Sequence, residues 1–142
     1  MPQKVTLEGD LPQKFILLGE DDPDDQELLT DVFSAIDNSF ILFFVNNGKE
    51  VLSALEKLKD GHLPCLIVLD YNMPGMNGAD ILRELGGNPR YNDIPRIVWS
   101  TSGSERFKKD CLQLGALDYV IKPSNNLELE KIARYMLSHC LV

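Results

Sequence analysis

The sequence predicts an α/β fold, in which a parallel sheet carries helices on both of its faces. Five short apolar runs alternate along the chain with five segments of helical period. The runs are continuous rather than alternating between apolar and polar residues, which is the pattern of strands that are covered on both sides. They lie at residues 15–18, 40–45, 65–69, 97–99 and 119–121.

The segments between these runs carry signals for the start and end of a helix. Asp22 is a good N-cap for the first helix because its side chain can accept a backbone hydrogen bond, and proline follows at the first helical position, where it is favoured. The second helix follows Gly48, and a third, weaker one ends before the glycine pair 86–87. A capping-box pattern over residues 102–105 opens the fourth, and the fifth opens near Asn125 with a glutamate three residues on.

Length and charge limit the classes of function. The 142 residues fit one domain, and the formal net charge of -8 argues against nucleic acid or anionic lipid as the main partner. No apolar run approaches the roughly 18 residues of a membrane span. Residues 1–13 have no apolar stretch of the kind found in signal peptides, so we expect a loosely ordered lead-in there.

The three cysteines, Cys65, Cys111 and Cys140, are odd in number and have no CxxC spacing. Each stands in an apolar context. We therefore expect reduced cysteines in the core of a cytoplasmic protein.

Polar residues follow the predicted strands where ligands bind in such folds, at the carboxyl ends of the strands. The acids Glu20 and Asp21 follow the first strand, and Asp70 ends the third. The pair Ser100–Thr101 follows the fourth strand, and Lys122 follows the fifth. One edge of the sheet is thus expected to gather several carboxylates, two hydroxyls and one ammonium.

Such a gathering of carboxylates favours a bound cation. Two charges about 4 Å apart repel by roughly 4 kcal/mol at an effective dielectric of 20. A divalent cation removes this repulsion, and a site made of oxygen ligands suits magnesium, with manganese as the alternative. We assign Glu20 and Asp21 to this site. The neighbouring Asp22, Asp24 and Asp25 are instead assigned to the cap and first turn of the following helix, where acids favour the helix dipole.

Asp70 stands where a buried strand emerges from the core. A carboxylate there can attack phosphorus and form an aspartyl phosphate. Lys122 and a hydroxyl of Ser100 or Thr101 would contact the transferred group. Pro123, directly after Lys122, restricts the turn so that the lysine reaches back over the strand ends.

Three motifs carry a resemblance to a known family: residues 15–25 (FILLGEDDPDD), 66–78 (LIVLDYNMPGMNG) and 118–123 (DYVIKP). With the hydroxyl pair, they resemble the receiver domains of response regulators in two-component signalling, over roughly residues 14 to 140. The resemblance implies a flavodoxin-like, five-stranded parallel sheet in the order 2-1-3-4-5 with five helices. It also implies a stand-alone receiver at residues 14–142 with no effector domain attached.

The resemblance implies a role for each site residue. Asp70 is the phosphoacceptor, Glu20 and Asp21 are the acid pair, and the main-chain carbonyl of Asn72 is a further metal ligand. Lys122 pairs with the phosphoryl group.

The switch residues also follow from the resemblance. Ser100 takes the position of the switch hydroxyl, although a slip of one residue would exchange it with Thr101. Tyr119 takes the position of the switch aromatic. Gly19, Arg96 and Trp99 stand where the family more often has apolar or aliphatic residues.

The implied partners are a sensor or hybrid histidine kinase, including a phytochrome-like one, and a phosphotransfer protein or downstream target. The resemblance also implies a second copy of the chain as a partner, in a homodimer formed through the fourth helix, fifth strand and fifth helix. The implied protein accepts phosphoryl groups and is not a metabolic enzyme. His62 and His139 stand in no context that suggests a relay histidine.

Three alternatives remain at this point. A phosphatase with an aspartyl-phosphate intermediate would want an acid two residues after Asp70, where this chain has Asn72. A second alternative is an interaction module that keeps the fold without phosphorylation. A flavin-binding module would need a loop rich in Ser, Thr and Gly after the first strand, which is absent.

Overall fold

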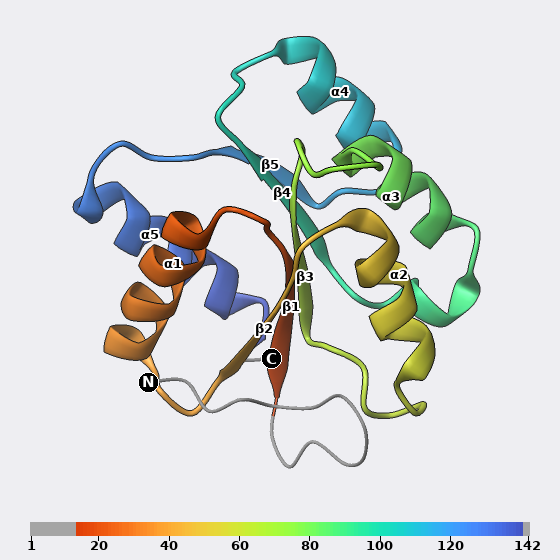
Figure 1. The fold of residues 1–142 in the computed structure, drawn as a ribbon, viewed down its shortest axis with the longest axis horizontal. Helices are drawn as coiled ribbons and strands as arrows, with labels where there is room; N and C mark the ends of the chain where they lie inside the picture. Colours follow the sequence, from red (N-terminus) through yellow and green to blue (C-terminus); the bar gives the residue numbers. More distant parts are fainter. Residues whose placement is uncertain (1–13, 141–142) are drawn as a thin grey trace.

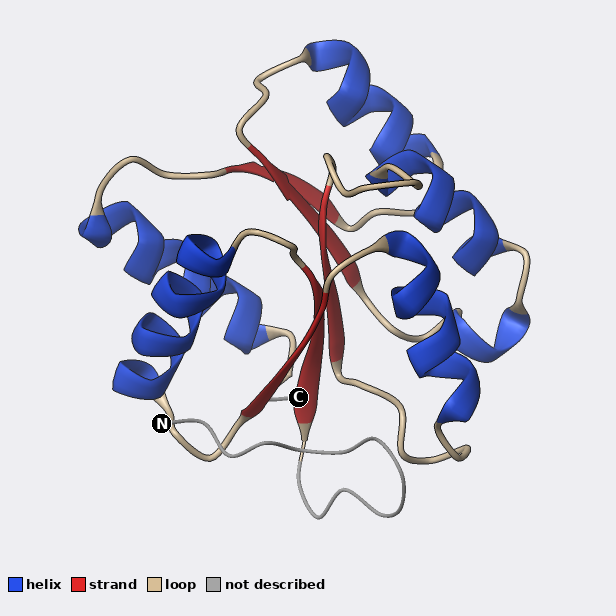
Figure 2. Ribbon diagram, viewed as in Figure 1, coloured by secondary structure: helices blue, strands red, loops and turns tan. Residues whose placement is uncertain are grey.

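The computed structural model describes residues 14–140, so the predicted lead-in at residues 1–13 lies outside the described part. Five parallel strands form one sheet in the order β2-β1-β3-β4-β5, which confirms the expected topology. The sheet runs through the middle of the molecule with helices on either side (Figure 2). The elements are β1 (Phe15–Gly19), α1 (Pro23–Ile36), β2 (Ile41–Val45), α2 (Gly48–Lys57), β3 (Leu66–Asp70), α3 (Gly78–Gly86), a 3-10 turn η1 (Pro89–Tyr91), β4 (Arg96–Ser100), α4 (Glu105–Gln113), β5 (Asp118–Ile121) and α5 (Asn126–Ser138).

Two apolar cores lie on opposite faces of the sheet. Helices α1 and α5 cover one face, and α2, α3 and α4 cover the other (Figure 1). Along the central strand β3, Ile67 and Leu69 point into the core under α2–α4, whereas Leu66 and Val68 point into the core under α1 and α5. This double burial explains why the strands are apolar without alternation.

The capping residues agree with the sequence except at α4. The side chain of Asp22 accepts a hydrogen bond from the backbone N–H of Asp24, and Asn125 caps α5 in the same way. The capping-box prediction over residues 102–105 was wrong, because α4 begins later, at Glu105, with Ser104 as its N-cap. The hydroxyl of Ser102 instead accepts from the backbone N–H of Ser104, inside the loop that precedes the helix.

Arg96, the unusual arginine of β4, connects this strand to the turn before it. Arg96 is buried, and its guanidinium donates to the Tyr91 carbonyl at 3.0 Å. Burial lowers the pKa of Arg96. The hydrogen bond anchors η1, the short turn that sequence patterns did not predict, to the first residue of β4.

Gly19 allows close packing at the end of β1. All five residues of β1 are buried and pair with β2, and the last four, Ile16–Gly19, also pair with β3. A Cβ atom at Gly19 would lie 2.8 Å from the Met73 methyl group and 3.0 Å from a methyl group of Val51. The glycine therefore leaves room for the loop after β3 to pack against β1, and this brings the loop to the strand ends.

The expectation of reduced cysteines was wrong for two of the three. Cys65 and Cys140 form a disulfide, which joins the residue before β3 to the C-terminal end of α5. The sequence gives no local motif for this pair, because 75 residues separate the two positions and only the fold brings them together. Cys111 is free and buried, as expected.

Within residues 14–140, no helix is long and apolar enough to cross a membrane.

Candidate functional site

The carboxyl ends of the strands bring the expected polar residues to one edge of the sheet. Glu20 follows β1, Asp70 ends β3, Ser100 ends β4 and Lys122 follows β5. The strand register places Asp70 beside Trp99 of β4, and the backbone N–H of Lys122 donates to the Ser100 carbonyl at 2.8 Å. These backbone pairs fix where each side chain begins.

Three carboxylates are close enough to share one metal ion. Glu20, Asp21 and Asp70 each offer an oxygen, and these oxygens lie within 4.8 Å of one another. Glu20 and Asp70 are buried, whereas Asp21 is exposed. An all-oxygen set with one solvent-facing member suits a hard divalent cation that keeps part of its water shell. The donor set therefore fits the ion that the sequence predicts.

Lys122 is the only cation within hydrogen-bond distance of these carboxylates in the part of the chain that the structure describes. Its Nζ donates to Glu20 Oε1 at 2.9 Å, Asp70 Oδ2 at 3.0 Å and Asp25 Oδ2 at 2.8 Å. Burial alone would lower the pKa of Lys122, but the three hydrogen bonds outweigh burial and raise the pKa above its usual value. The lysine is therefore charged and offsets part of the carboxylate repulsion.

The electrostatics of Glu20 differ from those of an ordinary surface acid. Its side chain is fully buried, and burial raises its pKa to about 7 against the opposing hydrogen bonds from Lys122 and from the Asp22 backbone. The negative charge of Asp70 adds to the rise. A bound cation would reverse this effect by favouring the ionised form.

We predict a pH dependence of stability that comes from Glu20. A carboxyl whose pKa is higher in the folded chain holds its proton there while the unfolded chain has lost it, so folding weakens as the pH rises from 4.5 to about 7. In EDTA, the free energy of unfolding should fall over this range relative to that of Glu20→Gln. The relative fall is at most about 3.5 kcal/mol, since the pKa rises from 4.5 to about 7 and one pKa unit corresponds to about 1.4 kcal/mol. Urea unfolding of both proteins measures it, and a difference that stays constant with pH would contradict the prediction.

Asp25 corrects the sequence-based assignment of the acids. It lies in the first turn of α1, as expected, but it also forms an ion pair with Lys122. Asp22 and Asp24 remain in the helix cap, where the Asp22 side chain accepts from the Asp24 backbone. The spacing of the acids alone could not separate Asp25 from Asp24, because the distinction depends on where Lys122 arrives from β5.

The hydroxyl residues lie in different surroundings. Ser100 is fully buried and accepts a hydrogen bond from the backbone N–H of Ser102 at 3.0 Å, whereas Thr101 is exposed. Tyr119 is buried, and its hydroxyl donates to the Ser102 carbonyl at 2.7 Å. Both Ser100 and Tyr119 thus bind the same loop residue, so a movement of that loop would change the hydrogen bonds of both side chains. The Tyr119 side chain belongs to the core on the face of the sheet that α2, α3 and α4 cover.

Two neighbours complete the site. The backbone N–H of Asn72 donates to Asp70 Oδ1 at 3.0 Å, while the Asn72 side chain is exposed. The Nζ of Lys122 lies 4.8 Å from the ring centroid of Trp99, which is a cation–π distance. From the sequence, Trp99 stood out only as an unusual residue of β4. Its position directly before Ser100 was the signal that could have assigned it to the site.

Comparison with known proteins identifies the family. The family model for the response regulator receiver domain matches residues 16–134. The chain belongs to the response regulator receiver domain family. An uncharacterized 14.6 kDa protein of Leptolyngbya boryana is 34% identical to this receiver over 131 residues, which are 92% of this chain and 93% of that protein. The receiver spans only 30% of the length of a 33% identical protein-glutamate methylesterase/protein-glutamine glutaminase of Clostridium acetobutylicum.

Solved structures of other receivers have the same fold. The phosphorylated cyanobacterial phytochrome response regulator RcpA superposes with a TM-score of 0.79 at 27% identity, covering 88% of this receiver and 91% of that chain. The Mn²⁺-bound form of the response regulator Rcp1 superposes with a TM-score of 0.78 at 28% identity, covering 91% of this receiver and 95% of that chain.

Proposed function

We propose that this receiver accepts a phosphoryl group on Asp70 from the phosphohistidine of a sensor or hybrid histidine kinase. The observation that carries the proposal is the joint position of Asp70, Lys122 and the Glu20–Asp21 pair at one edge of the sheet. An interaction module without this chemistry would not require a lysine that is ion-paired with three carboxylates, as Lys122 is with Glu20, Asp25 and Asp70. A phytochrome-like kinase is the proposed donor, because RcpA is a phytochrome response regulator of the same fold.

The transfer follows from the chemistry of the carboxylate. An oxygen of Asp70 attacks phosphorus while the bond between phosphorus and the imidazole nitrogen breaks, and the electron pair of that bond stays on the imidazole. The partly buried Lys122 ammonium would pair with the oxygens of the transferred group. The Ser100 hydroxyl, beside the end of β3, would supply a further contact, with exposed Thr101 as its neighbour.

Magnesium is the proposed cofactor, with manganese as the alternative. Glu20, Asp21, Asp70 and the main-chain carbonyl of Asn72 would hold it. Bound there, the ion would neutralise charge on the phosphoryl oxygens. The Mn²⁺-bound form of Rcp1 supports a divalent cation in a receiver of this fold.

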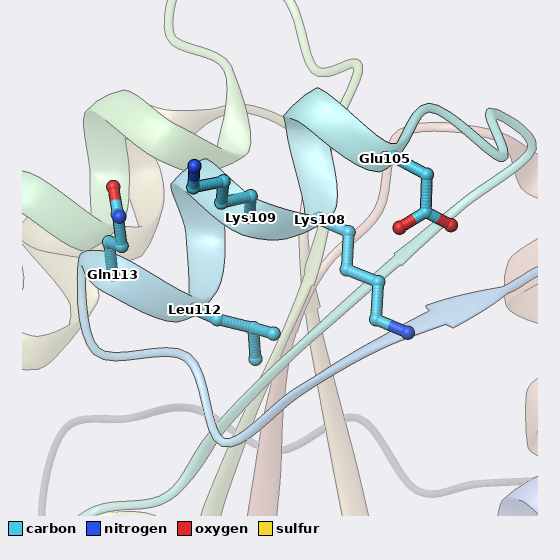
Figure 3. A pocket seen from close by; sticks show the side chains of 5 residues that line it. All are labelled: Glu105, Lys108, Lys109, Leu112 and Gln113. Atoms are coloured by element: carbon cyan, nitrogen blue, oxygen red, sulfur yellow. The ribbon is translucent and has the colours of Figure 1, made fainter.

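The proposed output is a change in protein binding. A contact between the phosphoryl group and Ser100 would move the loop at Ser102, to which Tyr119 is bonded. That loop leads into α4, whose outer side chains line a shallow surface pocket (Figure 3). Leu112 on α4 and Ile121 on β5 are exposed apolar residues on these elements. We infer that the surface of α4, β5 and α5 binds a downstream target, a phosphotransfer protein or a second copy of this receiver.

We propose a cytoplasmic location, since the phosphodonor domain of a histidine kinase lies there. The Cys65–Cys140 disulfide then meets a reducing environment, in which such bonds are uncommon. The stability of the protein would therefore depend on the redox state of its surroundings.

Incubation with acetyl phosphate tests the proposal. In the presence of Mg²⁺, the intact mass should rise by one phosphoryl group, and EDTA should prevent the rise. Emission of Trp99, the single tryptophan of the chain, should change on Mg²⁺ addition because its ring contacts Lys122. A receiver that binds Mg²⁺ without gaining mass, or that binds none, would instead support the interaction module without phosphorylation.

A further inference from the structure

Lys122 has one carboxylate partner that lies outside the proposed metal cluster. The Oδ2 of Asp25 is 2.8 Å from its Nζ, which is the shortest of the three ion-pair distances. The Asp25 side chain retains 23% of its exposure, and that of Lys122 retains 11%. Asp25 is therefore the most solvent-accessible of the three carboxylates that contact the lysine.

A cation bound by the cluster would disturb the other two ion pairs. Glu20 and Asp70 belong to both sets, because each pairs with Lys122 and each offers an oxygen to the cluster. A divalent ion would compete for these oxygens and would repel the ammonium. Lys122 then needs an acceptor that the metal ion does not use.

We propose that Asp25 is a positioning residue that holds the Lys122 ammonium when a divalent cation takes Glu20 and Asp70. The inference rests on the proposed function and assigns a role within it. The ring of Trp99, 4.8 Å from Nζ, is a second contact that keeps the ammonium beside the strand ends rather than in solvent. The lysine then remains within reach of a phosphoryl group on Asp70.

The role of Asp25 predicts a coupling to metal affinity that runs through Lys122. Without the Asp25 charge, the displaced ammonium has no acceptor outside the cluster and competes with the cation. The variant Asp25→Asn should therefore bind Mg²⁺ about three- to tenfold more weakly, which lies in the lower part of the range of coupling between contacting groups. Asp25→Glu keeps a carboxylate at the same helical position and should recover most of the affinity.

Calorimetric titration of the full chain with Mg²⁺ tests the inference. Asp24→Asn is the matched control, because Asp24 neighbours Asp25 in the same helical turn, carries the same charge and uses its backbone, not its carboxylate, in the cap. It should change the affinity less than Asp25→Asn does. In a Lys122→Gln background, Asp25→Asn should have no more effect than Asp24→Asn. Circular dichroism and thermal unfolding show that each variant is folded before it is titrated.

The outcomes separate this inference from the proposed function. If the parent protein binds no Mg²⁺, the proposed function fails. If the parent binds Mg²⁺ but Asp25→Asn behaves as Asp24→Asn does, the proposed role of Asp25 fails alone. If the effect of Asp25→Asn persists in the Lys122→Gln background, Asp25 acts on the cation directly, and positioning of the lysine is overturned.

Discussion

Replacement of Asp70 by asparagine is expected to reduce phosphoryl incorporation from acetyl phosphate by at least about a hundredfold, because an amide is a poor nucleophile toward phosphorus. The fold should survive the change. Lys122 keeps Glu20 and Asp25 as partners, and the removal of one carboxylate from a crowded site lowers the repulsion within it. Intact mass spectrometry in saturating Mg²⁺ measures the incorporation, and thermal unfolding measures the stability.

A second variant distinguishes the nucleophile from a metal ligand. Asp21→Asn removes an exposed carboxylate of the cluster but leaves Asp70 in place. Its incorporation should fall at low Mg²⁺ and recover at high Mg²⁺, whereas that of Asp70→Asn should not recover at any concentration. Parental incorporation in Asp70→Asn would show that another residue accepts the phosphoryl group.

The largest effect on stability is expected from loss of the disulfide. A chain-entropy treatment of a cross-link across about 75 residues gives roughly 4 kcal/mol of stabilisation. The double variant Cys65→Ala with Cys140→Ala should lose about this free energy of unfolding and melt roughly 10 °C or more below the parent. A reducing agent should lower the melting temperature of the parent to a similar degree and leave the double variant unchanged.

The free cysteine provides the control for this experiment. Cys111→Ala also removes a buried sulfur atom, but it breaks no cross-link, so its melting temperature should still respond to reductant. Phosphoryl incorporation by the folded double variant should match that of the parent, because Cys65 precedes β3 whereas Asp70 ends it. An unfolding curve of the parent that is insensitive to reductant would contradict a stabilising disulfide.

Local patterns were sufficient to predict most of the fold. Continuous apolar runs marked the strands because both faces of this sheet are covered, and Asp22 and Asn125 marked two helix starts by their capping chemistry. The start of α4 was wrong because Ser102 and Ser104 both suit an N-cap. Only the course of the loop decides between them. The turn η1 opens with Asn88 as its N-cap and Pro89 at its first position, which was a local signal, and Arg96 adds a tertiary contact to its last residue.

The site was predictable where a residue lies directly at a strand end. Glu20, Asp70, Ser100 and Lys122 all begin from backbone positions that the sheet fixes. The ion pair of Asp25 with Lys122 could not be predicted in this way. It joins positions 97 residues apart, one on a helix and one beyond a strand. The Cys65–Cys140 pair failed for the same reason, since composition and spacing carry no information about a distance that the whole fold determines.

The disulfide also divides the chain into a closed ring and two open ends. Asp70, Ser100 and Lys122 lie inside the ring, whereas Glu20 and Asp21 lie before it. Under mechanical force applied at the termini, the ring cannot extend, which hides roughly 260 Å of chain at about 3.5 Å per residue. An unfolding motor that translocates the polypeptide from either end would first pull a single length of chain, which is α1 or the C-terminal residues. At the disulfide it would reach the closed ring that contains Asp70 and Lys122, where two lengths of chain have to pass through the motor at the same time.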